Sequence, residues 1–233
     1  MKKLSALLLA IIMCLSTMSC SSSDDDSTVT DNNTNTPDEA PDEAPDESPD
    51  ENVKKEISRG NVWHVVYTNY FLDFRFLLPD SWDFVSEDTL AMMAGLTSDE
   101  ISKENFKYTL ENKKTVYDMI AIDSETDTSI VAGYDNLSKM GISSSSFTVQ
   151  QYLDRVKNQM VSSGIPVVFG SIKTVTLGET EFFKATGVIE TERKSTTVVY
   201  YLKKIDNYMC YMGVTIPEGY TVEEIEDMFE VIS

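Results

Sequence analysis

The stretch TTVVYYLKKIDNYMCYMGVTI, residues 196–216, decides the fold of this chain. Side chains alternate between the two faces of a strand, so Val198, Tyr200 and Leu202 share one face while Val199 and Tyr201 share the other. The residues IDNY suit a tight turn, which pairs the two halves as antiparallel strands. Because both faces are largely apolar, both must be covered. We therefore predict an α+β fold in which helices cover both faces of an antiparallel β-sheet, an α/β/α sandwich.

Further strands and helices are predicted across the rest of residues 60–233. Apolar runs with strand character lie at residues 63–68, 72–78, 115–124, 128–137, 166–177 and 180–192. Two capping boxes, Thr148 with Gln151 and Thr221 with Glu224, each predict the start of a helix. Shorter helices are predicted after Ser86 and from residues 97–98. These elements, over about 170 residues, suit one globular domain at residues 60–233.

The N-terminus has the pattern of an export signal. Lys2 and Lys3 precede an apolar run over residues 4–15, which is shorter than the roughly 20 residues that span a membrane. Residues 17–20, TMSC, resemble a bacterial lipobox, although Thr17 stands where that motif carries an aliphatic residue. We predict a lipoprotein signal peptide at residues 1–19, with Cys20 as the lipidation site. The alternative is an ordinary secretory signal in which Cys20 is incidental.

A diacylglyceryl group on Cys20 would hold the chain at the extracytoplasmic face of the cell membrane, since two acyl chains give a stable anchor. Residues 20–59 then form a predicted disordered tether, because the repeat PDEAPDEAPDESPDE at residues 37–51 is too polar to build a core. We expect this tether to be a solvating spacer with no binding role, and the alternative is a stalk that holds the domain away from the membrane.

Acidic residues dominate the chain, whose formal net charge is −20. Of the 39 acidic residues, 12 lie within residues 24–51, where no Lys or Arg occurs. Residues 52–233 still carry 27 acidic residues against 17 basic ones. A domain with this balance and no basic stripe is not expected to bind nucleic acid. Attraction to anionic lipid headgroups is not expected either.

The start of the domain resembles a known group of proteins. A Tyr-x-Asn element at Tyr67 and Asn69 precedes an aromatic strand and the Pro-x-x-Trp turn from Pro79 to Trp82. This order resembles uncharacterised lipoproteins of Gram-positive anaerobes and the wider PsbP-like family. The resemblance implies an antiparallel sheet between helices and a protein that binds or stabilises other proteins, and it transfers no catalytic residue. We predict that Pro79 and Trp82 form a structural corner and that Trp63 and Trp82 are core anchors.

Catalytic sites and cofactors find little support in the sequence. His64 is the only histidine, and it lies in the strand predicted at residues 63–68, far from any marked nucleophile. Cys210, the one cysteine of the domain, is predicted to pack as a small apolar side chain, so no disulfide can form within the domain. One histidine and one cysteine make a poor zinc site. We therefore expect no catalytic residue, no metal ligand and no cofactor.

Two charged motifs invite a functional interpretation. Asp123, Glu125 and Asp127 alternate as in a calcium loop, but the positions that need glycine and glutamate carry other residues, so a solvated hairpin turn is the better interpretation. Residues 193–195, RKS, and residues 202–204, LKK, are predicted to form a small basic cluster near one end of a hairpin. Such residues more often keep a sheet edge soluble than bind a partner.

The sequence thus favours a lipid-anchored extracytoplasmic domain without catalytic activity that binds or assists an envelope protein. The alternative is a lipoprotein that binds a small ligand in a pocket between sheet and helices, and an envelope hydrolase is a third possibility. An exposed apolar patch would support a protein partner, and a large apolar pocket would support a ligand.

Overall fold

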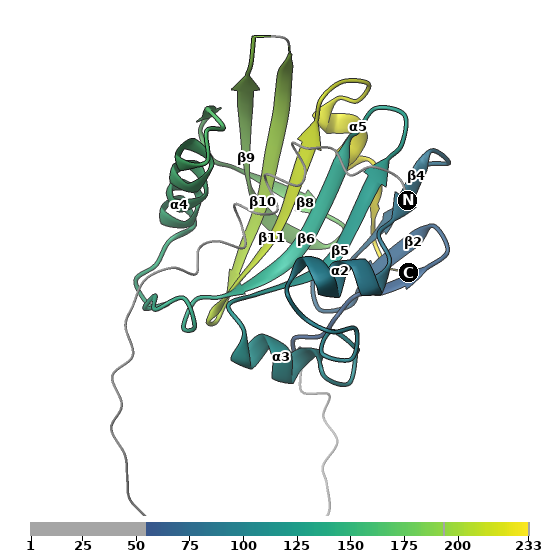
Figure 1. Cartoon of the computed structure of the whole chain (residues 1–233), viewed down its shortest axis with the longest axis vertical. Helices are drawn as coiled ribbons and strands as arrows, with labels where there is room; N and C mark the ends of the chain where they lie inside the picture. Colours follow the sequence, from purple (N-terminus) through teal and green to yellow (C-terminus); the bar gives the residue numbers. More distant parts are fainter. Residues whose placement is uncertain (1–54, 193, 233) are drawn as a thin grey trace, which may run out of the picture.

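A large antiparallel sheet forms the centre of the domain, which the computed structural model describes at residues 55–192 and 194–232. This sheet has 8 strands in the order β4-β5-β6-β11-β10-β9-β7, with β8 paired to β9 (Figure 1). Its strands are β4 (Trp82–Phe84), β5 (Thr115–Asp123), β6 (Ser129–Asn136), β7 (Val167–Phe169), β8 (Lys173–Leu177), β9 (Thr180–Glu190), β10 (Ser195–Ile205) and β11 (Tyr208–Ile216). The paired strands β10 and β11 are those that the stretch at residues 196–216 predicts, joined at Asp206 and Asn207.

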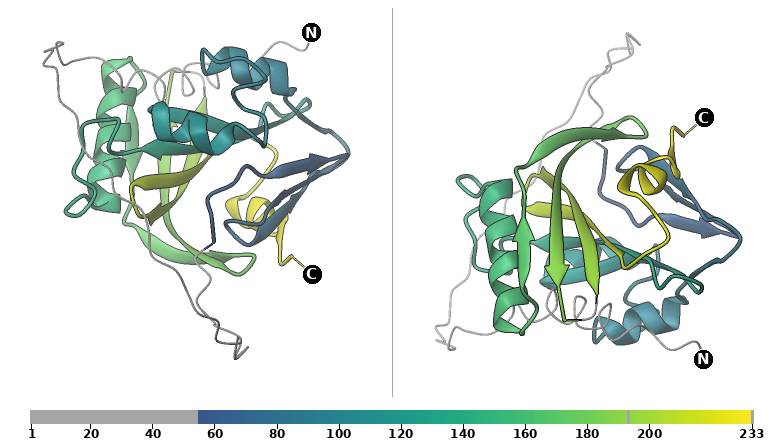
Figure 2. Two further views of the ribbon diagram at one scale, coloured as in Figure 1. Left: turned by 90° about the horizontal axis from the view of Figure 1, so that it is seen from below. Right: turned by 90° about the horizontal axis from the view of Figure 1, so that it is seen from above.

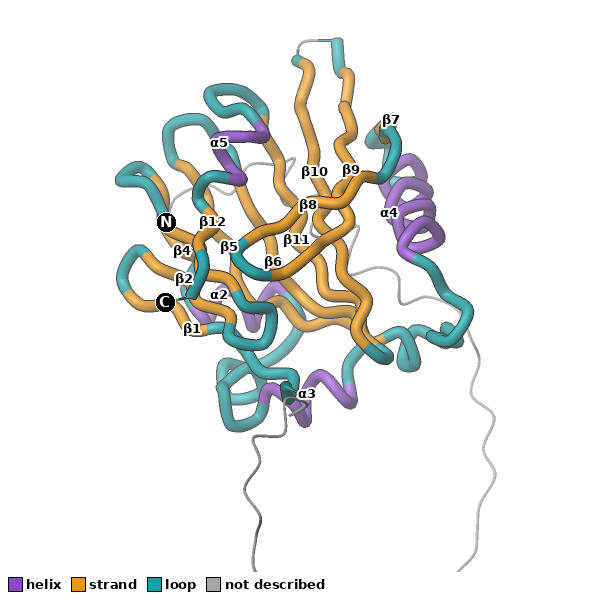
Figure 3. Tube along the Cα trace, turned by 180° about the vertical axis from the view of Figure 1, so that it is seen from behind, coloured by secondary structure: helices purple, strands orange, loops and turns teal. Residues whose placement is uncertain are grey.

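A second, smaller sheet was not predicted from the sequence. It contains β1 (Asn61–Trp63), β2 (Val66–Asn69), β3 (Phe74–Leu77) and β12 (Phe229–Glu230), in that order and all antiparallel. The first and last strands of the domain therefore belong to one sheet, with β1 and β12 at its opposite edges. Seen from behind, β8 and this small sheet lie in front of the long strands (Figure 3).

Four helices complete the described part of the chain: α2 (Glu87–Met93), α3 (Phe106–Asn112), α4 (Val149–Ser162) and α5 (Val222–Glu226). Both predicted capping boxes are present at the starts of α4 and α5, and Ser86 caps α2 as expected. The helix predicted from residues 97–98 begins only at Phe106, because its apolar side chains are too sparse to hold a longer helix. No helix among the described residues is long and apolar enough to cross a membrane.

Helix α4 packs on one face of the large sheet. Directly paired residues share a face of the sheet, so Tyr200 and Leu202 of β10 lie on the same face as Gly213 and Tyr211 of β11. This is the face that α4 covers. Tyr152 of α4 donates a hydrogen bond to Asp135 of β6 on this face, at 2.7 Å. Both views in Figure 2 place α4 at one side of the molecule and the small sheet with α5 at the other.

The opposite face of the large sheet is packed mainly by aromatic side chains of the small sheet. Tyr201 lies 6.4 Å from the ring of Phe229 on β12, and its hydroxyl donates to Glu226 of α5 at 3.0 Å. Phe229 also packs on Phe74 and Phe76 of β3, with ring centroids 5.3 and 4.8 Å apart. The predicted α+β fold around an antiparallel sheet is therefore confirmed, while the covering of this face by helices stays a prediction.

The two tryptophans differ from each other. Trp82 is buried against Phe76 after the Pro79 turn, which confirms the predicted structural corner. Trp63 is 65% exposed, so its prediction as a core anchor is wrong. The strand predicted at residues 63–68 is in fact two strands, because a tight turn at His64 and Val65 separates β1 from β2.

A buried carboxylate lies beneath α4. Asp135 accepts hydrogen bonds from Thr115 at 2.6 Å and from Tyr152 at 2.7 Å, and it is fully buried. Burial raises the pKa of Asp135 to about 6, although both hydrogen bonds oppose the shift. In the unfolded chain an Asp titrates near 3.9. The stabilisation from protonated Asp135 is therefore complete below about pH 4 and is lost as the pH rises through about 6.

We predict that Asp135→Asn removes this pH dependence. Between pH 4 and pH 7 the wild type should lose on the order of 3 kcal/mol of unfolding free energy through Asp135. The variant should not show this loss. Urea unfolding at pH 4, 5, 6 and 7 measures it. Asp99→Asn, at an exposed position, should follow the wild type throughout, and parallel curves for Asp135→Asn and wild type would contradict the prediction.

Candidate functional site

A second buried carboxylate fixes the small sheet to the large one. Asp118 of β5 is 1% exposed and accepts a hydrogen bond from the Tyr67 hydroxyl at 2.5 Å. Asn69 donates through its amide to the Tyr67 hydroxyl at 2.8 Å, to Asp118 at 3.2 Å and to the Tyr134 hydroxyl at 2.8 Å. The Tyr-x-Asn element therefore has a structural role, because both of its side chains bind the same carboxylate.

The same carboxylate holds the beginning of the domain. The backbone N–H of Gly60 donates to both oxygens of Asp118, at 3.0 and 3.1 Å. The Arg59 Nε lies 3.7 Å from the Asp118 Oδ1. A Cβ atom at Gly60 would come within 2.2 Å of the Tyr67 ring, so only glycine fits. Burial raises the pKa of Asp118, while hydrogen bonds from Tyr67 and Gly60 and the charge of Arg59 oppose the shift. Asp118 thus sets where the chain enters the domain.

From this fixed point the hairpin of β1 and β2 extends outward. Trp63 pairs with Val66, which leaves a two-residue turn in which His64 has a φ of 51°. The turn is held because the N–H of Leu78 donates to the carbonyl of Val65 at 2.8 Å. No Gly, Asn, Asp or Pro occurs in this turn, which explains why the sequence did not predict it.

The hairpin presents an apolar row across three strands. Trp63 of β1 pairs with Val66 of β2, and Val66 pairs with Leu77 of β3, so the three side chains share one face. Tyr67 and Phe76 point to the buried face, so this row lies on the outer face. Trp63 is 65% exposed, Leu77 is 40% exposed and Val65 beside them is 48% exposed. We call Trp63, Val65, Val66 and Leu77 the apolar row.

An apolar row of this kind is unusual on the outside of a sheet, where polar residues normally face water. The next row of the same face has that ordinary character, because Arg75 and Glu230 form an ion pair at 2.7 Å. Strand β1 also forms an edge of the small sheet. A contiguous apolar patch beside an open edge is typical of a protein-interaction surface.

The structure separates the two residues on which catalysis would depend. His64 lies in the exposed hairpin turn, where its ring packs at a tilt against the Trp63 ring, with the centroids 5.6 Å apart. Cys210 is fully buried in β11, and burial raises the pKa of its thiol far above the usual range. A thiol held in the protonated form is a poor nucleophile. Cys210 therefore packs as a small apolar side chain, as predicted.

The acidic motif from Asp123 to Asp127 forms the turn between β5 and β6, as expected. Asp123 accepts from the N–H of Glu125 at 3.1 Å and from the Thr126 hydroxyl at 2.6 Å. These bonds use the carboxylate for the turn itself. Within residues 55–192 and 194–232, no group of three His, Cys, Asp or Glu side chains lies close enough to hold a metal ion.

The predicted basic cluster does not form. Lys194 and Lys203 lie near opposite ends of β10, an extended strand of 11 residues, and Arg193 lies outside the described residues. Lys194 lies 3.9 Å from Glu218, and Lys203 donates to the carbonyl of Glu181 at 3.1 Å. The prediction treated both motifs as one end of a hairpin, but the length of the strand separates them.

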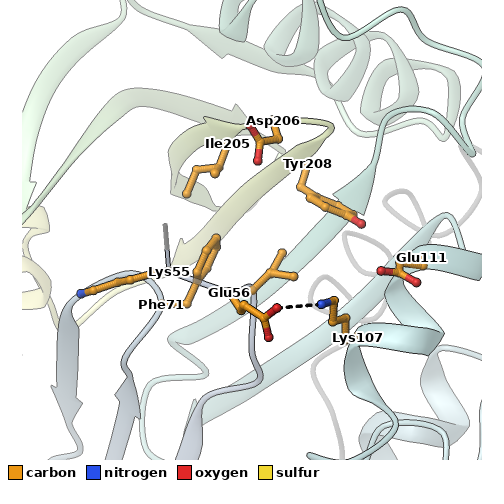
Figure 4. Close-up of a pocket in the computed structure, with 9 residues that line it drawn as sticks. Lys55, Glu56, Phe71, Lys107, Glu111, Ile205, Asp206 and Tyr208 are labelled. Carbon is orange, nitrogen blue, oxygen red and sulfur yellow. Dashed lines mark hydrogen bonds and ion pairs between the residues drawn. The ribbon is translucent and has the colours of Figure 1, made fainter. Parts of the chain in front are cut away.

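Two hollows bear on the ligand-binding alternative. The first, which we call the α3 groove, has a volume of about 420 Å³ and lies between α3, the β10–β11 turn and residues 55–57 (Figure 4). Its lining combines Ile57, Phe71, Ile205 and Tyr208 with Lys55, Glu56, Lys107, Glu111 and Asp206. The second, of about 340 Å³, lies between β8, β9 and α5 and includes Lys173 and Lys184. The first hollow sets charged side chains around a partly apolar floor, and the second mixes polar and apolar surface about equally, whereas a buried small ligand needs a predominantly apolar, enclosed pocket.

The comparisons with known proteins give remote likenesses. No model of a protein family matches the chain, and no curated protein matches it. The fold is similar to the solved cyanobacterial PsbP, CyanoP, of Synechocystis sp. PCC 6803, with 11% identity and a TM-score of 0.42 over 76% of this chain and 95% of that one. It is also similar to LpqN, involved in cell envelope biogenesis of Mycobacterium tuberculosis, with 11% identity and a TM-score of 0.36 over 69% of this chain and 83% of that one.

A third similar structure is the Ran-binding protein Mog1p of Saccharomyces cerevisiae, with 9% identity and a TM-score of 0.36 over 76% of this chain and 86% of that one. A solved PsbP is thus among the structures similar to this chain, in keeping with the PsbP-like resemblance of its sequence. Likenesses this remote assign neither a family nor an activity.

Sequence reasoning missed Asp118, the apolar row and the α3 groove. An acid in the middle of the apolar run at residues 115–124 was the available signal for Asp118, since a buried charge needs partners. Cys20, the predicted lipidation site, lies outside the described residues.

We predict that Tyr67→Phe destabilises the domain. The change removes the hydroxyl that donates to Asp118 and accepts from Asn69, which should lower the unfolding free energy by about 1–3 kcal/mol. Urea unfolding at pH 7 measures this loss. The matched control is Tyr108→Phe, whose ring is exposed on α3, and it should change the free energy by less than about 0.5 kcal/mol. We call Asp118 with its partners Tyr67, Asn69 and Gly60 the Asp118 cluster. Equal stabilities for the two variants would show that this cluster does not hold the small sheet.

Proposed function

We propose that this chain is a non-catalytic accessory domain that binds an envelope protein at the extracytoplasmic face of the cell membrane. The apolar row of the β1–β2 hairpin carries the proposal. Trp63 is the anchor, because tryptophan is enriched among the residues that dominate binding energy at protein interfaces. Its rigid support by the Asp118 cluster favours binding, since little conformational freedom remains to be lost.

The neighbourhood of Trp63 supports a protein partner over a small ligand. The row lies on an outer sheet face and beside the edge strand β1, where an incoming chain can reach backbone groups as well as side chains. A flat outer face of this kind does not enclose a small molecule. Ligand binding in one of the two hollows is the second candidate, and the volume and the partly apolar lining of the α3 groove favour it.

Lipid on Cys20 is the second part of the proposal. The export signal at residues 1–19 and the TMSC motif support it. The tether at residues 20–59 would then let the domain reach a partner away from the membrane surface. A non-catalytic role is in keeping with the buried thiol of Cys210 and the exposed position of His64.

Replacement of Trp63 tests the interaction surface. We expect Trp63→Ser to reduce capture of the partner at least tenfold, because loss of an anchor residue costs about 2 kcal/mol or more. The assay is affinity capture of the lipidated protein from its own membranes, followed by mass spectrometry. Wild type should recover one protein in stoichiometric amount.

Tyr108→Ser is the matched control, since Tyr108 is equally exposed but lies on α3, far from the hairpin in sequence. It should capture as much partner as the wild type. Both variants should unfold at the wild-type temperature, which separates lost binding from lost folding. Undiminished capture by Trp63→Ser would refute the apolar row as the interaction surface.

Replacement of Cys20 tests the anchor. The wild-type protein should incorporate labelled palmitate in its own cell type and sediment with membranes, whereas Cys20→Ala should incorporate none and be released by washing. Label on the Cys20→Ala protein, or equal sedimentation of both, would contradict lipidation at this residue.

A further inference from the structure

Strand β1 is an edge of the small sheet with backbone groups that face outward. The N–H of Leu78 donates to the carbonyl of Val65 at 2.8 Å, so the backbone groups of Val65 and, two residues on, of Tyr67 point toward β3. Tyr67 lies directly opposite Val62 in the β1–β2 pair. This pair therefore exchanges no hydrogen bond, and the N–H and carbonyl of Val62 point away from β2.

The same edge is closed two residues earlier in the chain. The N–H of Gly60 points the same way as that of Val62, because alternate residues of an extended chain share a direction. It donates to the Asp118 carboxylate at 3.0 and 3.1 Å. Among the described residues, no strand pairs with the outer side of β1. The open part of the edge thus runs from Val62 to the turn at His64, which suits a short extended segment.

The side chains beside the open backbone groups are apolar on both faces of the small sheet. Val62 shares the inner face with Tyr67 but is 44% exposed, because it lies at the edge. Trp63 lies on the outer face as part of the apolar row. A strand added at this edge would therefore meet a large apolar side chain on each of its faces.

The hairpin also lacks the charges that protect other edges. Residues 60–72 contain no Asp, Glu, Lys or Arg, although 25% of the chain is charged. Three other strands that pair on one side only each carry a charge: Asp83 in β4, Lys173 in β8 and Glu230 in β12. Charges on an edge strand hinder pairing with another chain. Strand β1 has no such charge, so the segment that complements it is uncharged.

We propose that β1 binds an extended, uncharged segment of the protein partner, which joins the small sheet as a fifth strand and exchanges hydrogen bonds with the N–H and carbonyl of Val62. Main-chain pairing of this kind supplies affinity, and the side chains on either face supply specificity. The segment carries β-branched or aromatic residues beside Val62 and Trp63, since such cross-strand pairs stabilise a sheet. The inference rests on the proposed function, because it uses the same surface, and it specifies how the partner is held.

A second copy of this chain is the competing occupant of the edge. Residues 52–233 carry 27 acidic residues against 17 basic ones, so two copies repel each other. An uncharged segment of another protein is free of this repulsion. We therefore expect the purified chain to remain a monomer in light scattering over a range of concentrations.

The test selects random heptapeptides displayed on phage for binding to the purified chain with Cys20→Ser. The recovered sequences should be uncharged and should carry Val, Ile, Thr, Tyr, Phe or Trp at alternate positions. The most frequent peptide is then made with a fluorescein label, and its binding is measured by fluorescence anisotropy. Affinity should change less than twofold between about 50 and 500 mM NaCl, because no ion pair takes part. N-methylation of alternate peptide amides, in the register that faces β1, should abolish binding.

Val62→Pro tests the pairing from the side of the protein. Proline removes the N–H but is tolerated on an edge strand where that N–H faces water, so the melting temperature should stay close to the wild-type value. We expect this variant to bind the peptide at least fivefold more weakly, through the lost hydrogen bond. Val62→Thr is the matched control, because it keeps the N–H and the β-branched shape, and it should bind within twofold of the wild type. In the wild type, the peptide should slow hydrogen exchange of the Val62 amide.

Three outcomes would overturn strand addition: recovery of charged peptides or of none, equal peptide binding by Val62→Pro and wild type, or an unprotected Val62 amide in the complex. A wild-type dimer that Val62→Pro converts to a monomer would assign the edge to a second copy instead. In the capture assay, loss of the partner with Trp63→Ser but full capture with Val62→Pro would reject the added strand and keep the apolar row as the interaction surface.

Discussion

The carboxylate of Asp118 is the constraint on which the rest of the structure depends. A buried charge is costly unless hydrogen bonds surround it, and here three residues donate: Tyr67 and Asn69 of β2, and the backbone of Gly60. One side chain on β5 therefore joins the large sheet, the small sheet and the first residues of the domain. The Tyr-x-Asn element is explained by this role, since neither residue could be replaced without leaving a partner unsatisfied.

The position of both candidate surfaces follows from this joint. The β1–β2 hairpin extends from the Asp118 cluster as a short projection, and its outer face carries the apolar row around Trp63. On the other side of the entry point, Lys55 and Glu56 line the α3 groove.

Each face of the large sheet buries one carboxylate together with a tyrosine hydroxyl. Beneath α4, Tyr152 donates to Asp135, and on the face of Tyr201, Tyr67 of the small sheet donates to Asp118. Tyrosine suits both places, because its ring packs in the core while its hydroxyl satisfies a buried carboxylate. The second face differs in its packing, since phenylalanines of the small sheet lie against Tyr201 there.

The sequence by itself determined the antiparallel pair at residues 196–216, the starts of α2, α4 and α5, the Trp82 corner and the burial of Cys210, because periodicity, caps and turns act over a few residues. Only the tertiary structure decided that Trp63 faces water, that Lys194 and Lys203 lie apart and that Asp118 binds the backbone of Gly60 where the domain begins. Those outcomes depend on which strands pair across more than a hundred residues, as β12 does with β3, and local patterns do not encode such pairing.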